Sequence, residues 1–150
     1  QLSQSFFLDE IYSITDGPPP EINLSNEKNN GLAVLKLIND KLVSSVHDIS
    51  SGGLLIALAE MTFKSGYGIK IDRPKNLSNL MEHYFSEDQG RYLIEVEPNN
   101  LSKISNILNK SNIFNETVGE IQKDYFEVKG ELKIKINELY KVNNTWYNNY

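Results

Sequence analysis

Two short segments of the sequence contain residue types that could do chemistry. In the first, residues 46–61, a strand pattern changes into a helix pattern through the adjacent Gly52 and Gly53. The first turn of a helix has unpaired N–H groups and the positive end of the helix dipole, and glycines allow an anion to approach them closely. Ser50 and Ser51 could add hydroxyl donors. This segment therefore suggests a site for a phosphate group.

Asp48, near the start of the same segment, allows a second interpretation. Its carboxylate would repel a bare phosphate, although it could hold Mg²⁺. Asp48 or Ser50 could instead cap the helix, with the glycines only permitting close packing of the helix on a strand. Taken alone, the residues favour the cap. His47 has no serine at the spacing of a catalytic triad, so we interpret it as a hydrogen-bonded histidine at the end of a strand.

The second segment, residues 86–91, gathers an acid, an amide and a guanidinium directly before a predicted strand. Arg91 offers a fork of donors for a carboxylate or a phosphate, and Gln89 offers both a donor and an acceptor. The same residues could form a solvated turn with a surface pair between Arg91 and Glu87, and alone they favour that turn. No metal-ligand spacing and no nucleotide-binding glycine motif occurs, so we predict no catalytic residue and no metal ligand.

Composition excludes several classes of function. The 150 residues carry 15 basic and 20 acidic side chains, whereas a protein that binds nucleic acid or an anionic membrane should be basic. The longest apolar run, residues 54–59, is far shorter than the roughly 18 residues of a membrane span. The sequence has no cysteine, which rules out a cysteine nucleophile and fits a reducing compartment, so we expect a cytoplasmic protein. Because the first residue is Gln1, we also expect a segment of a longer polypeptide.

The periodicity of the apolar residues predicts helices that alternate with strands. Helices are predicted over residues 3–14, 24–40, 54–64, 79–85, 100–110 and 137–141, and strands over residues 42–46, 68–71, 91–96 and 118–121. In the second helix, Leu32, Val34, Leu35 and Ile38 make one apolar stripe. Near the C-terminus, two further strands share an apolar face only if their loop holds an odd number of residues, which predicts a hairpin with the turn 129–131.

Together these elements predict an α+β fold in which a mixed β-sheet is flanked by helices. Alternating strands and helices would suit a parallel sheet, but the hairpin near the end breaks a purely parallel plan. Since 150 residues are few for two domains, we expect one domain over residues 1–141. We expect the asparagine-rich residues 142–150 to form a mostly irregular tail.

Both segments resemble parts of a known family. The sequence HDISSGGLLIALAEM, residues 47–61, resembles the strand–loop–helix of the C-terminal domain shared by aminoimidazole-ribonucleotide (AIR) synthase and its relatives. It is most similar to the form HDxSDGGLxxALAEM of the phosphoribosylformylglycinamidine (FGAM) synthases. Residues 87–91, EDQGR, are similar to the acid–x–Gln–x–Arg segment of the same domain, and residues 17–19, GPP, resemble its Gly-x-Pro-Pro start.

This resemblance implies the second, C-terminal copy of the domain in an internally duplicated enzyme. FGAM synthases are ATP-dependent carbon–nitrogen ligases of purine biosynthesis, which convert formylglycinamide ribonucleotide to its amidine with ammonia from glutamine. The complete enzyme uses ATP and Mg²⁺, and the family's catalytic histidine, Mg²⁺-binding acids and main nucleotide contacts lie in the preceding domains. The chain would then be a scaffold and cleft wall that is inactive alone. Its partners would be the preceding domains, with glutaminase and small bridging subunits where the enzyme is multi-subunit.

By the same resemblance, we expect one set of residues to line a cleft between domains, with backbone contacts from the glycines outweighing side-chain chemistry. These residues are Asp48, Ser50, Gly52, Gly53, Glu87, Gln89 and Arg91. One position departs from the family pattern, because Ser51 stands where the family has an acid. In the second copy of a duplicated enzyme the corresponding site can be structural, and our hypothesis is that the loss of the acid there has little effect.

Two alternatives stay open. The chain could belong to another enzyme of the superfamily, such as AIR synthase, thiamine-monophosphate kinase, selenophosphate synthase or a hydrogenase maturation protein, although their loops differ from the form seen here. It could also be a non-catalytic interaction module, in which residues 50–53 are only a helix cap and residues 87–91 are only a turn. Titration with ATP, phosphate and Mg²⁺ would distinguish a ligand-binding site from a surface that binds none of these ligands.

Overall fold

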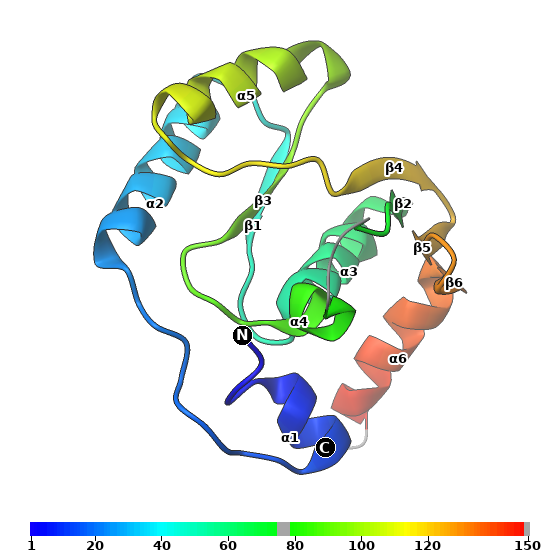
Figure 1. Cartoon of the computed structure of the whole chain (residues 1–150). Helices are drawn as coiled ribbons and strands as arrows, with labels where there is room; N and C mark the ends of the chain where they lie inside the picture. The colour runs from blue at the N-terminus through cyan, green and yellow to red at the C-terminus, as the bar shows by residue number, and fades with distance from the viewer. Residues whose placement is uncertain (75–78, 149–150) are drawn as a thin grey trace. The chain divides into compact units, whose positions relative to one another are not determined.

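The computed structural model describes residues 1–74 and 79–148 (Figure 1). These residues fall into two structural units. The first comprises residues 1–57 and 81–116, and the second comprises the described residues of 58–80 and 117–150. Helix α3 (Gly53–Ser65) begins in the first unit and ends in the second. Within the described part of the chain, no helix combines the length and the apolar character that a membrane span requires.

A two-stranded antiparallel ribbon organises the first unit. The elements of this unit, apart from the start of α3, are α1 (Phe6–Tyr12), α2 (Leu24–Asn39), β1 (Ser45–Asp48), α4 (Leu80–Phe85), β3 (Tyr92–Glu95), a 3₁₀ turn (Pro98–Asn100) and α5 (Leu101–Lys110). In the ribbon, Ser45 lies opposite Glu95 and Asp48 lies opposite Tyr92. Because the pairing is antiparallel, the end of β1 and the start of β3 meet at one end of the ribbon (Figure 1). The two candidate segments, which follow β1 and precede β3, are thereby brought together.

Local capping signals explain where α1 and α2 begin. The hydroxyl oxygen of Ser5 accepts a hydrogen bond from the N–H of Leu8 at 3.3 Å. Similarly, the side-chain oxygen of Asn23 accepts from the N–H of Asn26 at 3.0 Å. Such caps satisfy N–H groups that have no partner inside the helix.

The core of the first unit lies between α2, α5 and the ribbon. Leu37, Leu42, Ile104 and Leu108 form a buried cluster, and partly buried residues of β3 and of the adjoining segments pack against it. Leu37 comes from α2, while Ile104 and Leu108 come from α5, so each helix contributes apolar side chains to this cluster. Figure 1 shows the two helices beside the ribbon. This packing holds β1 and β3 in place.

Three residues of the apolar stripe predicted for the second helix, Leu32, Leu35 and Ile38, lie on the exposed side of α2, whereas the fourth, Val34, is half-buried. Leu24, Leu32, Leu35 and Ile38 are 75%, 54%, 52% and 46% exposed, and helical spacing places them on one side. Leu37, which makes the core contact, lies on the other side. The helix is therefore apolar on two faces, and only one of them is covered within the first unit. We call Leu24, Leu32, Leu35 and Ile38 the α2 outer face.

The first predicted strand was placed three residues too early. We expected a strand over residues 42–46, whereas β1 runs over Ser45–Asp48. Leu42 belongs instead to the buried cluster, and Val43 packs against that cluster. A run of apolar residues fits a strand and a buried connection equally well, so the pattern alone does not fix where the strand begins.

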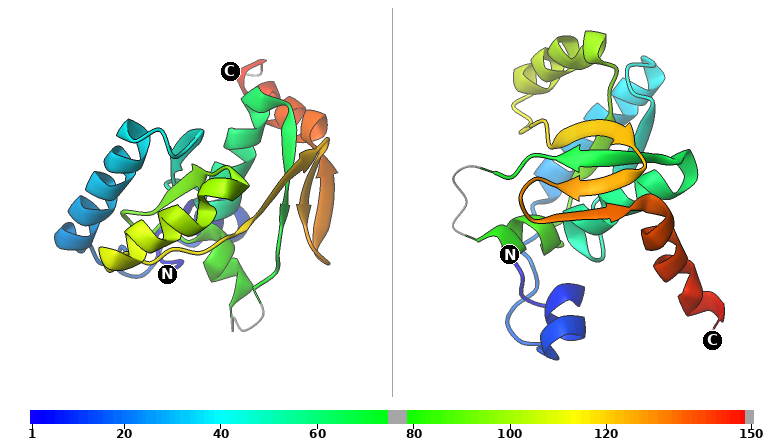
Figure 2. Two further views of the ribbon diagram at one scale, coloured as in Figure 1. Left: turned by 90° about the horizontal axis from the view of Figure 1, so that it is seen from above. Right: turned by 90° about the vertical axis from the view of Figure 1, so that its right-hand side faces the viewer.

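In the second unit, four strands form a mixed sheet, which confirms the predicted fold class. Its elements are β2 (Tyr67–Ile71), β4 (Gly119–Lys123), β5 (Tyr125–Val128), β6 (Leu132–Lys135) and α6 (Ile136–Asn148). The strand order is β4-β2-β5-β6, and β2 and β5 are parallel while the other pairs are antiparallel. The strands lie side by side in the right-hand view of Figure 2. The hairpin prediction is confirmed too, because Val128 lies opposite Leu132 across the loop 129–131.

The predicted C-terminal tail is wrong over most of its length. We expected a short helix over residues 137–141 and then irregular structure, but α6 continues to Asn148, and the last two residues of the predicted tail lie outside the described part. Residues 136–148 contain no glycine or proline to end the helix. The first turns are also anchored, because Ile136 is buried and the Tyr140 ring meets the Phe63 ring with centroids 5.8 Å apart.

Candidate functional site

Glu87 lies at the centre of the predicted site. One of its carboxylate oxygens, Oε1, accepts a hydrogen bond from the N–H of Gly52 at 2.7 Å. The same oxygen accepts a second bond from the N–H of Phe6 at 3.0 Å. The carboxylate thus joins the turn over residues 50–53, which we call the glycine turn, to the start of α1. A carboxylate oxygen can accept two such bonds, and its charge strengthens both.

Gly53 fills a position that no larger residue fits. It is buried with φ of +74°, and a Cβ atom built on it would lie 2.7 Å from both Cα and the carbonyl carbon of Phe85. Such a contact with backbone cannot be relieved by moving a side chain. A positive φ adds a further penalty for any residue with a Cβ. The glycine here serves the close approach of the glycine turn to the end of helix α4, whereas the packing interpretation expected a strand as the neighbour.

Two main-chain donors of the glycine turn, the N–H groups of Gly52 and Gly53, are already used within the chain. The N–H of Gly52 donates to Glu87, and the N–H of Gly53 donates to the carbonyl oxygen of Ser50 at 3.0 Å. A phosphate at this turn would have to displace the Glu87 carboxylate. Among residues 1–74 and 79–148, no group of three or more His, Asp or Glu side chains could hold a metal ion. In this arrangement the N–H groups of Gly52 and Gly53 are not available to a phosphate.

Arg91 supports its own turn with the donors that the sequence offered to a ligand. Its Nε donates to the carbonyl oxygen of Asp88 at 3.2 Å, and its Nη2 donates to the carbonyl oxygen of Ser86. Burial lowers the pKa of Arg91 and the nearby Asp88 raises it, but a guanidinium stays protonated at neutral pH. The sequence suggested a surface pair between Arg91 and Glu87, and that prediction is wrong. Arg91 donates to these carbonyl oxygens, and Glu87 accepts from backbone N–H groups instead.

The other predicted site residues present their side chains to solvent. Asp48, Ser50 and Gln89 are exposed. His47 is half-buried beside the end of β1, where its Nδ1 lies 2.6 Å from the carbonyl oxygen of Asp48. The structure therefore brings the two candidate segments together, with Glu87 and Gly53 inside the junction and these polar side chains around it. That the set lines a cleft between domains stays a prediction, because it concerns a neighbouring domain.

The sequence analysis did not predict that α1 contacts this junction. The N–H of Phe6 bonds to Glu87, and the Phe7 ring stacks on the Phe85 ring with centroids 4.4 Å apart. Nearly every residue has a backbone N–H, so the sequence does not show which of them donates to a distant side chain. Two phenylalanines in helices that are far apart in sequence give no indication that their rings stack. The only usable sign was the resemblance of residues 17–19 to the start of the family domain, which placed the N-terminal segment in the same domain.

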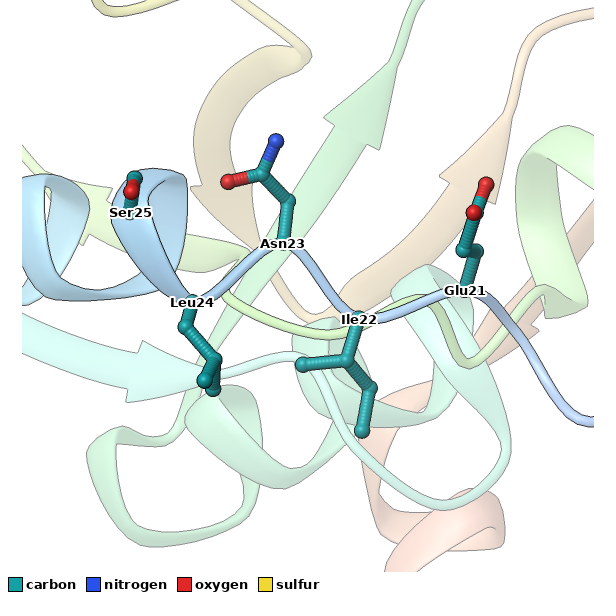
Figure 3. A pocket seen from close by; sticks show the side chains of 5 residues that line it. All are labelled: Glu21, Ile22, Asn23, Leu24 and Ser25. Atoms are coloured by element: carbon teal, nitrogen blue, oxygen red, sulfur yellow. The ribbon is translucent and has the colours of Figure 1, made fainter.

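A hollow of about 440 Å³ lies elsewhere on the first unit, at the segment that leads into α2. It is lined by Glu21, Ile22, Asn23, Leu24 and Ser25. Figure 3 shows the side chains of Ile22 and Leu24 on one side of this segment and those of Glu21 and Asn23 on the other. All five residues are exposed, and none belongs to the predicted site. The hollow is therefore a surface feature next to the α2 outer face.

Restoring the family acid at Ser51 is expected to have little effect. Ser51 is exposed, so an aspartate there would be solvated and would add one charge without burying it. From the resemblance to the FGAM synthases, we predict that Ser51→Asp leaves the rate of a complete enzyme containing this chain near that of the unsubstituted enzyme. Ser51→Ala provides the uncharged control in the same assay. A large rate change with Ser51→Asp alone would show that the missing acid matters.

Comparisons with known proteins agree with the resemblance. Residues 4–130 match the family described as AIR synthase related protein, C-terminal domain. The phosphoribosylformylglycinamidine synthase subunit PurL of Pelagibacter ubique (strain HTCC1062) is 40% identical over 149 residues, which cover 99% of this chain and 20% of that protein. The chain thus spans about a fifth of the length of this curated relative.

Solved structures with the same fold come from Thermotoga maritima. A structure of PurLQS has a TM-score of 0.70 at 22% identity, and the match covers 89% of this chain and 24% of that chain. A structure of PurL complexed with ATP has a TM-score of 0.67 at 23% identity, with coverage of 75% and 21%. At these identities the structures establish the fold that this chain shares with them.

Proposed function

The chain belongs to the AIR synthase related protein C-terminal domain family, and from this we propose that it is the C-terminal domain of a phosphoribosylformylglycinamidine synthase. The complete enzyme is an ATP-dependent carbon–nitrogen ligase of purine biosynthesis. It converts formylglycinamide ribonucleotide, with ammonia derived from glutamine, to formylglycinamidine ribonucleotide. The observation that carries this proposal is the 40% identity to a PurL subunit over nearly the whole chain.

Within that enzyme, the chain acts as a scaffold and cleft wall, with residues 1–141 as one domain. The N–H groups of Gly52 and Gly53 support this role, since both donate to groups of the chain itself and so stabilise its fold. The α2 outer face also supports it, because a helix that is apolar on two faces is suited to being covered on both. We propose that the preceding domains of the same polypeptide cover this face. The polar side chains of Asp48, Ser50 and Gln89 would then line the cleft beside those domains.

ATP and Mg²⁺ serve the complete enzyme in this proposal, and no residue of this chain is assigned to hold either. The solved PurL complexed with ATP supports the nucleotide. The solved PurLQS supports an assembly with further subunits, for which we propose glutaminase and small bridging subunits. With a net charge of −5, the chain gives no basis for nucleic acid or an anionic membrane as a partner. We place the enzyme in the cytoplasm.

An activity assay on two preparations tests the proposal. The purified chain and a complete enzyme that contains it are each assayed for ATP hydrolysis stimulated by formylglycinamide ribonucleotide. We expect turnover from the complete enzyme and none from the chain alone, because the proposed catalytic groups lie in the preceding domains. Clear turnover by the chain alone would contradict the scaffold role. A complete enzyme that ignores formylglycinamide ribonucleotide would contradict the assigned reaction.

A further inference from the structure

We propose that Glu87 is a positioning residue that couples the N-terminal segment, residues 1–20, to the glycine turn. The coupling passes through a single atom, since Oε1 accepts from the N–H of Phe6 at 3.0 Å and from the N–H of Gly52 at 2.7 Å. All of the residues involved belong to the first unit. The inference rests on these contacts and does not depend on the proposed function.

Both donors depend on the same acceptor. The N–H of Phe6 belongs to the first turn of α1, where no intrahelical partner exists, and the N–H of Gly52 lies just before α3. Glu87 is half-buried, so water can replace its carboxylate only in part. A hydrogen bond to a charged acceptor is stronger than one to a neutral acceptor, which favours conformations in which both N–H groups reach Glu87 together. The position of one donor is thereby linked to the position of the other.

A second contact of the N-terminal segment converges on the same junction. None of the seven residues of α1 is fully buried, but the Phe7 ring stacks on the Phe85 ring with centroids 4.4 Å apart. The backbone of Phe85 is also the surface against which Gly53 packs, at the distance where a Cβ would clash. Moving the N-terminal segment would therefore disturb both residues that hold the glycine turn, Glu87 through a hydrogen bond and Phe85 through its ring.

The consequence is a conformational link between two parts of the chain that are about forty-five residues apart in sequence. When the N-terminal segment is seated, Glu87 is held and the glycine turn keeps its conformation. When the segment is displaced, the turn loses the acceptor for Gly52 and becomes looser. Any partner that pulls on residues 1–20 would thus change the start of α3 without touching it.

Amide hydrogen exchange measured by NMR on the purified chain tests this link. In Glu87→Ala, we expect exchange of both the Phe6 and the Gly52 amides to speed up by about tenfold or more, since both lose a charged acceptor. The amide of Leu108 in the core serves as an internal reference for global unfolding. Glu97→Ala is the matched control, because it removes the same charge from an exposed position in the same unit.

Rescue and a remote variant distinguish coupling from general destabilisation. Glu87→Gln keeps an acceptor oxygen. In this variant the exchange rates of both amides should rise by a similar factor over the unsubstituted chain, and both should stay below the rates in Glu87→Ala. If Glu87→Ala does not fold, Glu87→Gln carries the test alone, with a parallel rise at both amides expected. Phe7→Ala, made in the N-terminal segment, should also speed exchange at Gly52. A rise at only one of the two amides, or an unchanged Gly52 amide in Phe7→Ala, would overturn the proposal.

Discussion

Replacing Gly53 with alanine is expected to lower the free energy of unfolding by about 2–5 kcal/mol. The added Cβ would lie 2.7 Å from two backbone atoms of Phe85, so either the glycine turn or the end of α4 must move. The φ of +74° adds the penalty that any residue with a Cβ pays in the left-handed region. Urea unfolding followed by circular dichroism measures the loss.

Gly130→Ala separates the two causes. Gly130 has φ of +77°, but a Cβ built there meets no atom within 4 Å. This variant therefore carries the backbone penalty alone, about 1–2 kcal/mol. The difference between the two variants reports the clash with Phe85. Equal losses of unfolding free energy in the two variants would mean that the glycine turn moves away from Phe85 at little cost. Close packing would then not be the reason for a glycine at position 53.

Features that depend on local sequence could be predicted. Helix α3 and strand β2 lie where the apolar pattern and the glycine signals placed them. The turn 129–131 followed from alternation alone, because only an odd loop puts the apolar residues of β5 and β6 on one face. Close approach was predicted for the glycine pair, and the structure shows it at Gly53, although the neighbour is the end of helix α4 and not the predicted strand.

Features that depend on distant partners could not be predicted. The start of β1 is set by pairing with β3, in which Ser45 lies opposite Glu95 and its hydroxyl donates to Glu95 at 2.8 Å. No local signal at residues 42–46 reveals a partner some fifty residues away. The extent of α6 was missed for a related reason, because asparagine-rich sequence has weak helix propensity, whereas an anchored first turn lets the helix continue.

The candidate site shows the same division. Glu87 and Arg91 were identified from the sequence as candidate site residues. Their hydrogen-bond partners were not predicted, because these partners are backbone groups. Charge pairing is the natural guess for an acid and a guanidinium four residues apart. In the folded chain each side chain bonds to backbone groups instead. Glu87 accepts from N–H groups at two helix starts, and Arg91 donates to two carbonyl oxygens. Such hydrogen bonds to a charged group contribute more to stability than an exposed ion pair does.

Leu37→Ala is expected to destabilise the purified chain by about 2–5 kcal/mol. Leu37 is 0% exposed and packs in the cluster with Leu42, Ile104 and Leu108, so truncation removes buried apolar surface and leaves a cavity. Leu35→Ala makes the same chemical change two residues earlier on the same helix, where the side chain is 52% exposed. Its expected cost in the purified chain is within about 0.5 kcal/mol. Urea unfolding of both variants measures the contrast.

The same pair of variants also tests what covers the α2 outer face. If the preceding domains cover it in the complete enzyme, Leu35 is buried there, and Leu35→Ala should cost more in the complete enzyme than in the purified chain. Leu37 is buried in either state, so the cost of Leu37→Ala should stay the same. A Leu35→Ala cost that does not change between the two preparations would mean that the α2 outer face stays in water in the assembled enzyme. A small cost for Leu37→Ala in both would instead contradict the core assigned to α2 and α5.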